Sequence, residues 1–393
     1  MLFQTLDDKD SCVAYYLNDK FQKEYQEEMS HSWTAPVYLR GLEIEYAYLY
    51  SQRSLEGSCP EHLKAELNEC MGLLRAYMTS FVVAKLDMKQ HCFFDLVPEH
   101  FLKRFCQIKN KICSHIFNNI EKPDNYDFLR SVHEICQDIS NRKVSLDFDS
   151  LSLSTLSRAS RGKFLRLKGS SPYIRYNMFG SKTGRFATKP NSLPILNLNK
   201  EFRSVIKPTN DVFVELDYNA FELRILLFLL GKEQPGMDMH EWNRKNVYHN
   251  SLTRSEAKTR IFSWLYNPES RDTESEDTYD RASVVSNYWD GAKIVNPFGR
   301  KINSDKFHAL SYLIQSTAVD LVMRQMIDLH KLLQSTKSHI AFTIHDSVII
   351  DMSREDAHLI PSFRESFSLY KGEYFLTNVS IGKDFGNMES IAC

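Results

Sequence analysis

A chain of 393 residues is too long for one simple hydrophobic core, so its length predicts two or three lobes. Its 42% hydrophobic and 25% charged residues are ordinary for a soluble globular protein, and the formal net charge of −1 argues against a surface coated with basic patches. The apolar run from Ile225 to Leu230 is far shorter than the roughly 20 residues that span a bilayer. The N-terminus carries acids where a signal peptide carries bases. We therefore expect an intracellular protein that is neither secreted nor bound to a membrane.

The eight cysteines are scattered without a Cys-x-x-Cys pair, and seven of them precede residue 137. Cys106 and Cys113 are seven residues apart in a helix-like segment, so they would share one face. This pattern is typical of reduced packing residues in an intracellular protein. We expect neither disulfides nor a zinc site.

The first third of the chain is predicted to be mainly helical. Residues 1–58 carry no motif that indicates a function. Apolar residues at helical spacing begin near Pro60 and continue to Phe81. Further helices are predicted over residues 98–120 and near residues 126–139.

A strongly basic stretch follows. Between Arg158 and Lys207 there are twelve lysines or arginines but one acid, Glu201. Tyr173 and Tyr176 are interleaved with the basic residues, and the segment contains strand-like and turn-like sequence. A charge run is usually a solvated face or a disordered arm. Here the aromatic residues favour an ordered surface that binds phosphates.

A buried strand that leads into a helix is predicted in the middle of the chain. Val212 to Leu216 is a short apolar run suited to a strand, and Phe221 to Leu230 is suited to a helix. Asn219 and the acid Glu222 have the spacing of an N-cap and its capping acid. Asp217 would then lie at the end of a rigid strand, where a carboxylate is free to bind a cation.

A second informative helix is predicted from Arg254 to Tyr266, opened by a capping box and ended by Asn-Pro. Arg254, Lys258, Phe262 and Tyr266 recur every four residues, so they lie along one broad face. The two cations are suited to a triphosphate, and the two aromatic rings are suited to a sugar and base. Near the C-terminus, two apolar runs flank Asp346, which predicts a hairpin with this aspartate at its tip.

Taken in order, these elements resemble the motifs of the family A DNA polymerases, the bacterial polymerase I type. Residues 217–224 read Asp-Tyr-Asn-Ala-Phe-Glu-Leu-Arg, where motif A of the family reads Asp-Tyr-Ser-Gln-Ile-Glu-Leu-Arg. The helix face that begins at Arg254 is similar to motif B, and residues 345–347 are similar to motif C, His-Asp-Glu. Further matches occur, in chain order, at Thr183-Gly184-Arg185, Pro190-Asn191, Asn197, Arg203, Asp238-Met239-His240, Phe298-Gly299-Arg300 and Gln315.

The resemblance implies an α+β fold: a right-hand polymerase with an antiparallel-sheet palm and a helical thumb and fingers. The implied domains are an N-terminal segment (1–58), a thumb (59–170), a first palm segment (171–231), fingers (232–290) and a second palm segment (291–393). A compact form without an exonuclease domain is expected, because about 58 residues before the thumb fall below the usual domain size. The pair Glu43 and Glu45 is interpreted as part of a surface helix.

The resemblance also implies roles for individual residues. Asp217 and Asp346 would be catalytic and, with the carbonyl of Tyr218, would bind two Mg²⁺ ions, for which Mn²⁺ can substitute. Lys258 is a catalytic candidate as the proton donor to pyrophosphate. The implied nucleotide-binding residues are Arg254, Lys258, Phe262, Tyr266, Glu222 and His240, of which Glu222 would block a 2′ hydroxyl. The implied DNA-binding residues are Arg185, Gln315, His345, Asn197 and Arg203.

The sequence departs from the family pattern at several positions. Asn267 stands where a glycine usually follows motif B, and Ser311 stands where an asparagine is usual. Ser347 replaces the glutamate of motif C, which puts the metal geometry and the rate in doubt. The acidic segment 269–280 is expected to be a loop on the outer surface of shortened fingers, because it would repel DNA.

The function implied is that of a DNA-templated DNA polymerase, which adds dNTPs to a primer 3′ end by two-metal-ion nucleotidyl transfer without intrinsic proofreading. The expected partners are primer-template DNA and dNTPs, with a separate exonuclease or processivity subunit as a further candidate. Its compact size suggests a viral source, and hence the cytoplasm of a bacterial or virus-infected cell.

Two alternatives stay open. One is a single-subunit RNA polymerase relative, which Glu222 disfavours. The other is a degenerate polymerase that serves as a DNA-binding accessory subunit. Ser347 and the short fingers favour the second alternative, whereas the two aspartates and the intact face of motif B oppose it.

Overall fold

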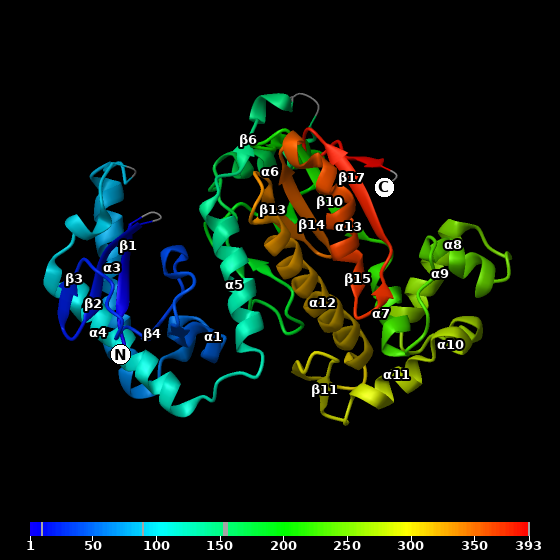
Figure 1. Ribbon diagram of the computed structural model, residues 1–393, viewed down its shortest axis with the longest axis horizontal. Coiled ribbons are helices and arrows are strands. Elements are labelled where there is room, and N and C mark those ends of the chain that lie inside the picture. Colours follow the sequence, from blue (N-terminus) through cyan, green and yellow to red (C-terminus); the bar gives the residue numbers. More distant parts are fainter. Residues whose placement is uncertain (9–10, 89, 152–155, 392–393) are drawn as a thin grey trace. The chain divides into compact units, whose positions relative to one another are not determined.

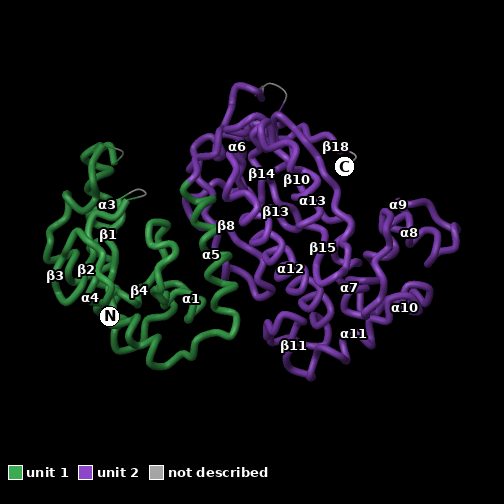
Figure 2. The backbone as a smooth tube through the Cα atoms, in the orientation of Figure 1, with its two compact units in different colours: residues 1–141 green, residues 142–393 purple. Residues whose placement is uncertain are grey.

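The computed structural model describes residues 1–8, 11–88, 90–151 and 156–391. They form two compact units, Met1–Asn141 and Arg142–Cys393, which Figure 2 distinguishes by colour. Two units agree with the expectation from chain length.

Unit 1 combines a small sheet with helices. Its three-stranded antiparallel sheet has the order β1-β2-β3, with strands β1 (Gln4–Asp8), β2 (Ser11–Leu17) and β3 (Lys20–Gln22). A short parallel pair joins β4 (His31–Ser32) to β5 (Glu45–Tyr46). The helices are α1 (Ala47–Ser51), α2 (Leu55–Ser58), α3 (Lys64–Val83), α4 (Glu99–Asn119) and α5 (Tyr126–Asn141).

The core of unit 1 includes Leu6 and Tyr16 from the sheet and Phe81, Phe101 and Cys106 from α3 and α4. The three predicted helical segments are confirmed as α3, α4 and α5. The seven cysteines among the described residues form no disulfide in the structure.

The predicted surface helix at Glu43 and Glu45 is wrong. Glu45 begins β5, and its carboxylate accepts a hydrogen bond of 2.7 Å from Lys122 and lies 3.7 Å from His31. The two glutamates look like a solvated helix face in sequence, but pairing with β4 decides the local structure.

Unit 2 is built around a five-stranded antiparallel sheet of order β13-β14-β10-β17-β18 (Figure 1). Its strands are β10 (Val212–Tyr218), β13 (His339–Ile344), β14 (Ser347–Met352), β17 (Thr377–Gly382) and β18 (Glu389–Ile391). Smaller two-stranded pairs are β6 (Ser145–Leu146) with β9 (Ile206–Lys207), β7 (Tyr176–Asn177) with β8 (Ala187–Thr188), β11 (Lys293–Val295) with β12 (Lys301–Asn303), and β15 (Leu369–Tyr370) with β16 (Glu373–Tyr374).

The helices of unit 2 are α6 (Arg158–Lys168), α7 (Phe221–Leu229), α8 (Met239–Asn246), α9 (Arg254–Tyr266), α10 (Thr273–Tyr279), α11 (Arg281–Tyr288), α12 (Ala309–Leu333) and α13 (Ile360–Ser368). Short 3₁₀ turns across the two units are η1 (Val37–Leu39), η2 (Glu61–Leu63), η3 (Phe93–Asp95), η4 (Phe148–Ser150), η6 (Ile195–Asn197), η7 (Lys200–Val205) and η8 (Arg354–Leu359). Within the described residues, every helix is too short or too polar to span a bilayer.

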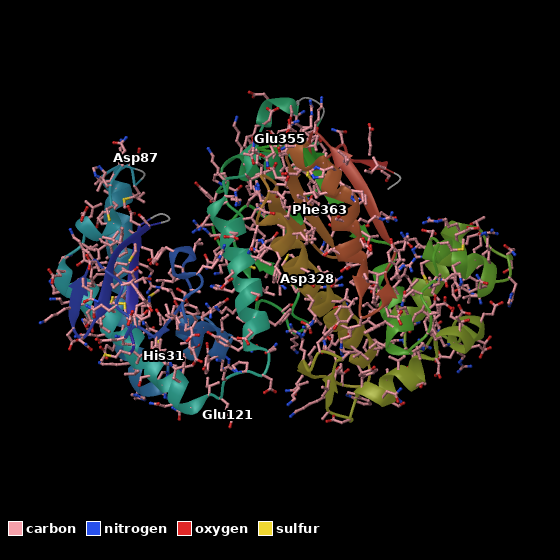
Figure 3. The ribbon with its side chains drawn as sticks, viewed as in Figure 1. His31, Asp87, Glu121, Asp328, Glu355 and Phe363 are labelled. Atoms are coloured by element: carbon pink, nitrogen blue, oxygen red, sulfur yellow. The ribbon has the colours of Figure 1, made fainter. Side chains whose placement is uncertain are left out.

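The two faces of strand β10 have different surroundings, because successive side chains of a strand point to opposite sides. Val214, Leu216 and Tyr218 are buried, and the ring of Tyr218 stacks on Phe367 of α13 with centroids 4.5 Å apart. Phe363 of the same helix, labelled in Figure 3, is only 1% exposed. Glu215 and Asp217 lie on the opposite face and are half-buried. The predicted α+β class and antiparallel sheet are therefore confirmed.

Candidate active site

Asp217 and Asp346 come from adjacent strands of the central sheet. Asp217 is the sixth residue of β10, and its partner in β14 is Ser347, the residue that follows Asp346. Strands β13 and β14 are joined by a two-residue turn, because Ile344 pairs with Ser347. The register thus places both predicted aspartates at the same end of the sheet.

The turn that carries Asp346 has an unusual backbone. His345 has φ of +52°, a left-handed conformation that is costly for residues other than glycine. The surrounding hairpin holds it: Thr343 donates a hydrogen bond of 2.7 Å to the Ser347 carbonyl, and Ser347 donates one of 3.1 Å to the Ile344 carbonyl. Asp346 is therefore presented by a constrained turn.

Burial and mutual repulsion leave the two carboxylates in need of a counter-charge. The pKa of Asp217 is raised to about 7, mainly by burial and also by the nearby charges of Glu215 and Asp346. The pKa of Asp346 is raised to about 6, mainly by burial and also by the charge of Glu222, while Arg185 acts in the opposite direction. A bound cation would offset the burial and the mutual repulsion of the two negative charges.

The oxygen donors at this end of the sheet fit magnesium, which prefers carboxylate and carbonyl oxygens and keeps several water ligands. Asp217, Asp346 and the main-chain carbonyl of Tyr218 are oxygen donors of this kind. Among the described residues, no three His, Cys, Asp or Glu side chains gather closely enough to hold an ion by themselves. Water and substrate oxygens would complete the coordination.

Helix α9 presents the predicted face. The capping box of Thr253 and Glu256 is present, because the two residues exchange side-chain and backbone hydrogen bonds. Arg254, Lys258 and Tyr266 are exposed and Phe262 is half-buried, while Ala257, Ile261, Trp264 and Leu265 point into the core. The rings of Phe262 and Tyr266 are stacked, with centroids 6.2 Å apart and planes inclined by 11°.

Helix α8 adds His240 and Asp238 to this surface. The His240 ring lies 5.6 Å from that of Phe262, and its Nδ1 atom is buried without a hydrogen-bond partner. Asp238 caps α8 by accepting a bond of 2.9 Å from the Glu241 amide. Asp238 also binds the Arg254 guanidinium through two bonds of 2.9 and 2.8 Å. The ion pair holds the pKa of Asp238 well below its usual range, although burial acts in the opposite direction.

Glu222 is hydrogen-bonded to two other predicted site residues. Its carboxylate accepts a hydrogen bond of 3.1 Å from Arg185 and another from the hydroxyl of Tyr266. Motif A, the Thr-Gly-Arg turn and motif B therefore meet at one carboxylate. Burial raises the pKa of the Tyr266 phenol, and the bond to Glu222 raises it further.

Three predicted DNA-binding residues line one cavity of about 400 Å³: Arg185, Asn197 and His345. Val319 and Met323 of α12 form another part of its wall. Gln315 lies one turn before Val319, so it occupies the same helix face. Arg203 does not line this cavity; its guanidinium lies 4.7 Å from the ring centre of Phe385.

Two local predictions are wrong. Asn219 is not the N-cap of α7, because Ala220 takes that position with φ of +48° and the Asn219 side chain instead binds Asp238 and the Met239 amide. The acidic segment 269–280 is not a loop, because residues 273–279 form α10. Three of its carboxylates, those of Asp272, Glu274 and Glu276, form ion pairs with Arg260 and Arg281.

The sequence did not reveal several residues that support the site. Arg224 is fully buried and donates to the carbonyls of Asn219, Pro235 and Met237. Its place in motif A was the only signal, because carbonyl partners leave no pattern in a sequence.

Arg300 forms a second such support. It binds the buried Asp320 at 2.6 Å, and its guanidinium lies so close to Gly184 that a Cβ there would approach within 2.7 Å. Gly184 also has φ of +84°, so only glycine suits this turn beside Arg185.

Comparisons with known proteins include a relative in sequence and a neighbour in structure. No protein-family model matches the sequence. The DNA polymerase of Mycobacterium phage D29 is 26% identical over 192 residues, an alignment that covers 40% of this chain and 31% of the phage protein. The chain therefore matches about a third of the length of that relative.

The second similarity is structural. The POL domain of Pol1 from M. smegmatis, solved as a complex with DNA primer-template and dNTP, superposes with a TM-score of 0.57 and 12% sequence identity. The match covers 73% of this chain and 75% of the mycobacterial domain. The chain described here therefore shares the fold of that polymerase domain.

Proposed function

We propose that this protein is a DNA-directed DNA polymerase, a nucleotidyltransferase that adds dNTPs to the 3′ end of a primer. The observation that carries the proposal is the convergence of Asp217 and Asp346 at the same end of the central sheet. The similarity to a phage DNA polymerase and to a mycobacterial polymerase domain supports it.

In the proposed mechanism, Asp217, Asp346 and the Tyr218 carbonyl would hold two Mg²⁺ ions, for which Mn²⁺ could substitute. When bound, these ions lower the pKa of the primer hydroxyl and neutralise charge on the phosphates. The protein contributes by holding both carboxylates on rigid strands, so that little reorganisation is needed during the reaction.

Helix α9 would position the nucleotide. Arg254 and Lys258 would bind its phosphates, and Lys258 would give a proton to the leaving pyrophosphate. Phe262 and Tyr266 would contact the sugar and base, with His240 beside Phe262. Glu222 would exclude a 2′ hydroxyl, which makes dNTPs the preferred substrates.

The cavity beside the hairpin would receive the primer-template. Arg185 and Gln315 carry donors that can reach the acceptors of the minor groove. Asn197, His345 and Arg203 would contribute further DNA contacts.

We also propose the right-hand layout of palm, fingers and thumb, with the segments 59–170, 171–231, 232–290 and 291–393 in the order thumb, palm, fingers, palm. The predicted end of the thumb at residue 170 remains a proposal, since the division into compact units falls earlier, after Asn141.

Primer extension tests the function directly. Wild-type protein with Mg²⁺ should extend a primer, and Asp217→Asn or Asp346→Asn should reduce the rate at least about a thousandfold, or ~4 kcal/mol. Both variants should still bind the primer-template. Asp328→Asn is a matched control, because this exposed aspartate of α12 pairs only locally with Lys331 (Figure 3).

Further assays distinguish the proposed polymerase from the two alternative functions and test for proofreading. Extension with NTPs as fast as with dNTPs would indicate an RNA polymerase relative. DNA binding without extension, equal in wild type and Asp346→Asn, would indicate an accessory subunit, an alternative that Ser347 motivates. A primer with a mismatched 3′ end tests the sequence-based expectation that this chain does not proofread.

A further inference from the structure

Strand β10 carries a second acidic residue on the face of Asp217. Glu215 precedes Asp217 by two residues, so both side chains project to the same side of the sheet. Glu215 is half-buried in the middle of a central strand, where glutamate is unfavourable unless it has a partner or a function. Its position therefore needs an explanation.

The nearest explanation is Ser347 on the adjacent strand. Ser347 lies opposite Asp217 and diagonally across from Glu215, whose own partner is Ile349. Diagonal neighbours are within reach of long side chains, so the Glu215 carboxylate lies on the same face as Ser347, whose hydroxyl donates to the Ile344 carbonyl. Glu215 thus lies beside Ser347, the position at which the similar motif C carries a glutamate.

A purely structural role beside Arg203 is the competing explanation. Among the described residues, Arg203 and Glu215 form no ion pair, and the Nε atom of Arg203 is buried without a hydrogen-bond partner. The guanidinium of Arg203 packs over Phe385. Arg203 therefore does not account for an acidic residue at position 215.

We propose that Glu215 is a positioning carboxylate beside the metal site, acting from β10 in place of an acid at position 347. The inference rests on the proposed polymerase function. Among the described residues, no three His, Cys, Asp or Glu side chains gather closely enough to hold an ion, so Glu215 would not coordinate the ions itself. It would instead accept hydrogen bonds from their water ligands and so orient them.

The test is direct measurement of metal binding. Mn²⁺ is titrated, by electron paramagnetic resonance, into the protein bound to primer-template with a dideoxy-terminated primer and the matching dNTP. Glu215→Gln should weaken Mn²⁺ binding about tenfold, as is usual when an outer partner of a metal site is removed. The Mg²⁺ concentration that gives half-maximal extension should rise by a similar factor. Glu233→Gln, at an exposed position after α7, is the matched control.

A second variant tests the replacement itself. Ser347→Glu introduced into Glu215→Gln should restore Mn²⁺ binding, because it returns an acid to the same space from the adjacent strand. Melting curves in EDTA verify that each variant is folded. If Glu215→Gln does not fold, Glu215→Asp keeps the charge on a shorter side chain and should require more Mn²⁺ than wild type.

Different failures have different meanings. Unchanged Mn²⁺ binding in Glu215→Gln, or a slower rate with an unchanged Mg²⁺ requirement, would overturn the role of Glu215 and leave the polymerase proposal intact. Absence of rescue by Ser347→Glu would overturn the claim of replacement. A wild-type protein that neither extends a primer nor binds Mn²⁺ would overturn the proposed function itself.

Discussion

The hydroxyl of Tyr266 donates a hydrogen bond to the carboxylate of Glu222, which joins the last turn of α9 to the first turn of α7. The same carboxylate accepts a bond from Arg185. A carboxylate held from two sides cannot easily move to make room for an additional group on a substrate. This arrangement underlies the first prediction.

Glu222→Ala should increase incorporation of ribonucleotides relative to deoxyribonucleotides by at least about tenfold, or ~1.4 kcal/mol. The physical reason is the loss of the side chain proposed to exclude the 2′ hydroxyl. Single-turnover extension with dATP and ATP measures the ratio. Tyr266→Phe keeps the ring and should change the ratio less; an equal change in both variants would contradict the role of Glu222.

The ion pair with Asp238 occupies the Nε and Nη2 atoms of Arg254, so it would compete with the phosphate binding proposed for Arg254. This competition gives opposite expectations for variants of the two residues. Arg254→Ala should weaken dNTP binding roughly tenfold, because it removes a charged hydrogen bond worth about 1.5 kcal/mol. Asp238→Asn can still cap α8 and should strengthen dNTP binding about two- to fivefold, since an exposed ion pair contributes at most about 1 kcal/mol. Nucleotide titrations of the DNA complex measure both. Weaker binding in Asp238→Asn would show that the pair organises the site instead of competing with substrate.

His240 should make the folded protein sensitive to mild acid. Burial lowers the pKa of His240 to about 4, Lys258 and Arg254 lower it as well, and Asp238 acts in the opposite direction. The ordinary value is 6.5, so below that pH the unfolded chain binds a proton that the folded chain resists. The stabilisation is complete above pH 6.5 and is lost as the pH falls toward 4, with a loss of about 2 kcal/mol at pH 5.

Thermal melting at pH 7.5 and pH 5 measures this effect. The change in melting temperature between pH 7.5 and pH 5 should be smaller for His240→Gln than for wild type. His91→Gln replaces an exposed histidine and should behave as wild type. A pH response of His240→Gln equal to that of wild type would refute the assignment.

Arg224 should be important for stability and not for substrate contact. Its guanidinium is 0% exposed, and burial lowers its pKa to about 10. Arg224→Met would leave the carbonyls of Asn219, Pro235 and Met237 without donors and should lower the free energy of unfolding by about 3 kcal/mol. Urea unfolding measures the change, with the exposed Arg271→Met as control. Equal midpoints for the two variants would refute the prediction.

Several elements could be predicted because their signals lie within one short stretch of the chain. The face of α9 follows from a four-residue spacing and a capping box, and both depend on residues within one helix. The positions of Asp217 and Asp346 at a strand end and a hairpin tip follow from short apolar runs beside polar turns. The strands of residues 1–58 were not predicted, because they are short and lack regular alternation.

Contacts between side chains that lie far apart in the chain became visible once the chain was folded. The sequence gives no sign that Asn219 binds Asp238 or that Arg224 binds three carbonyls. The position of Glu215 beside Ser347 depends on the register of β10 against β14, and a shift of one residue would turn either side chain to the opposite face. Register is set by the packing of whole strands against the core, so a local pattern of residues cannot specify it.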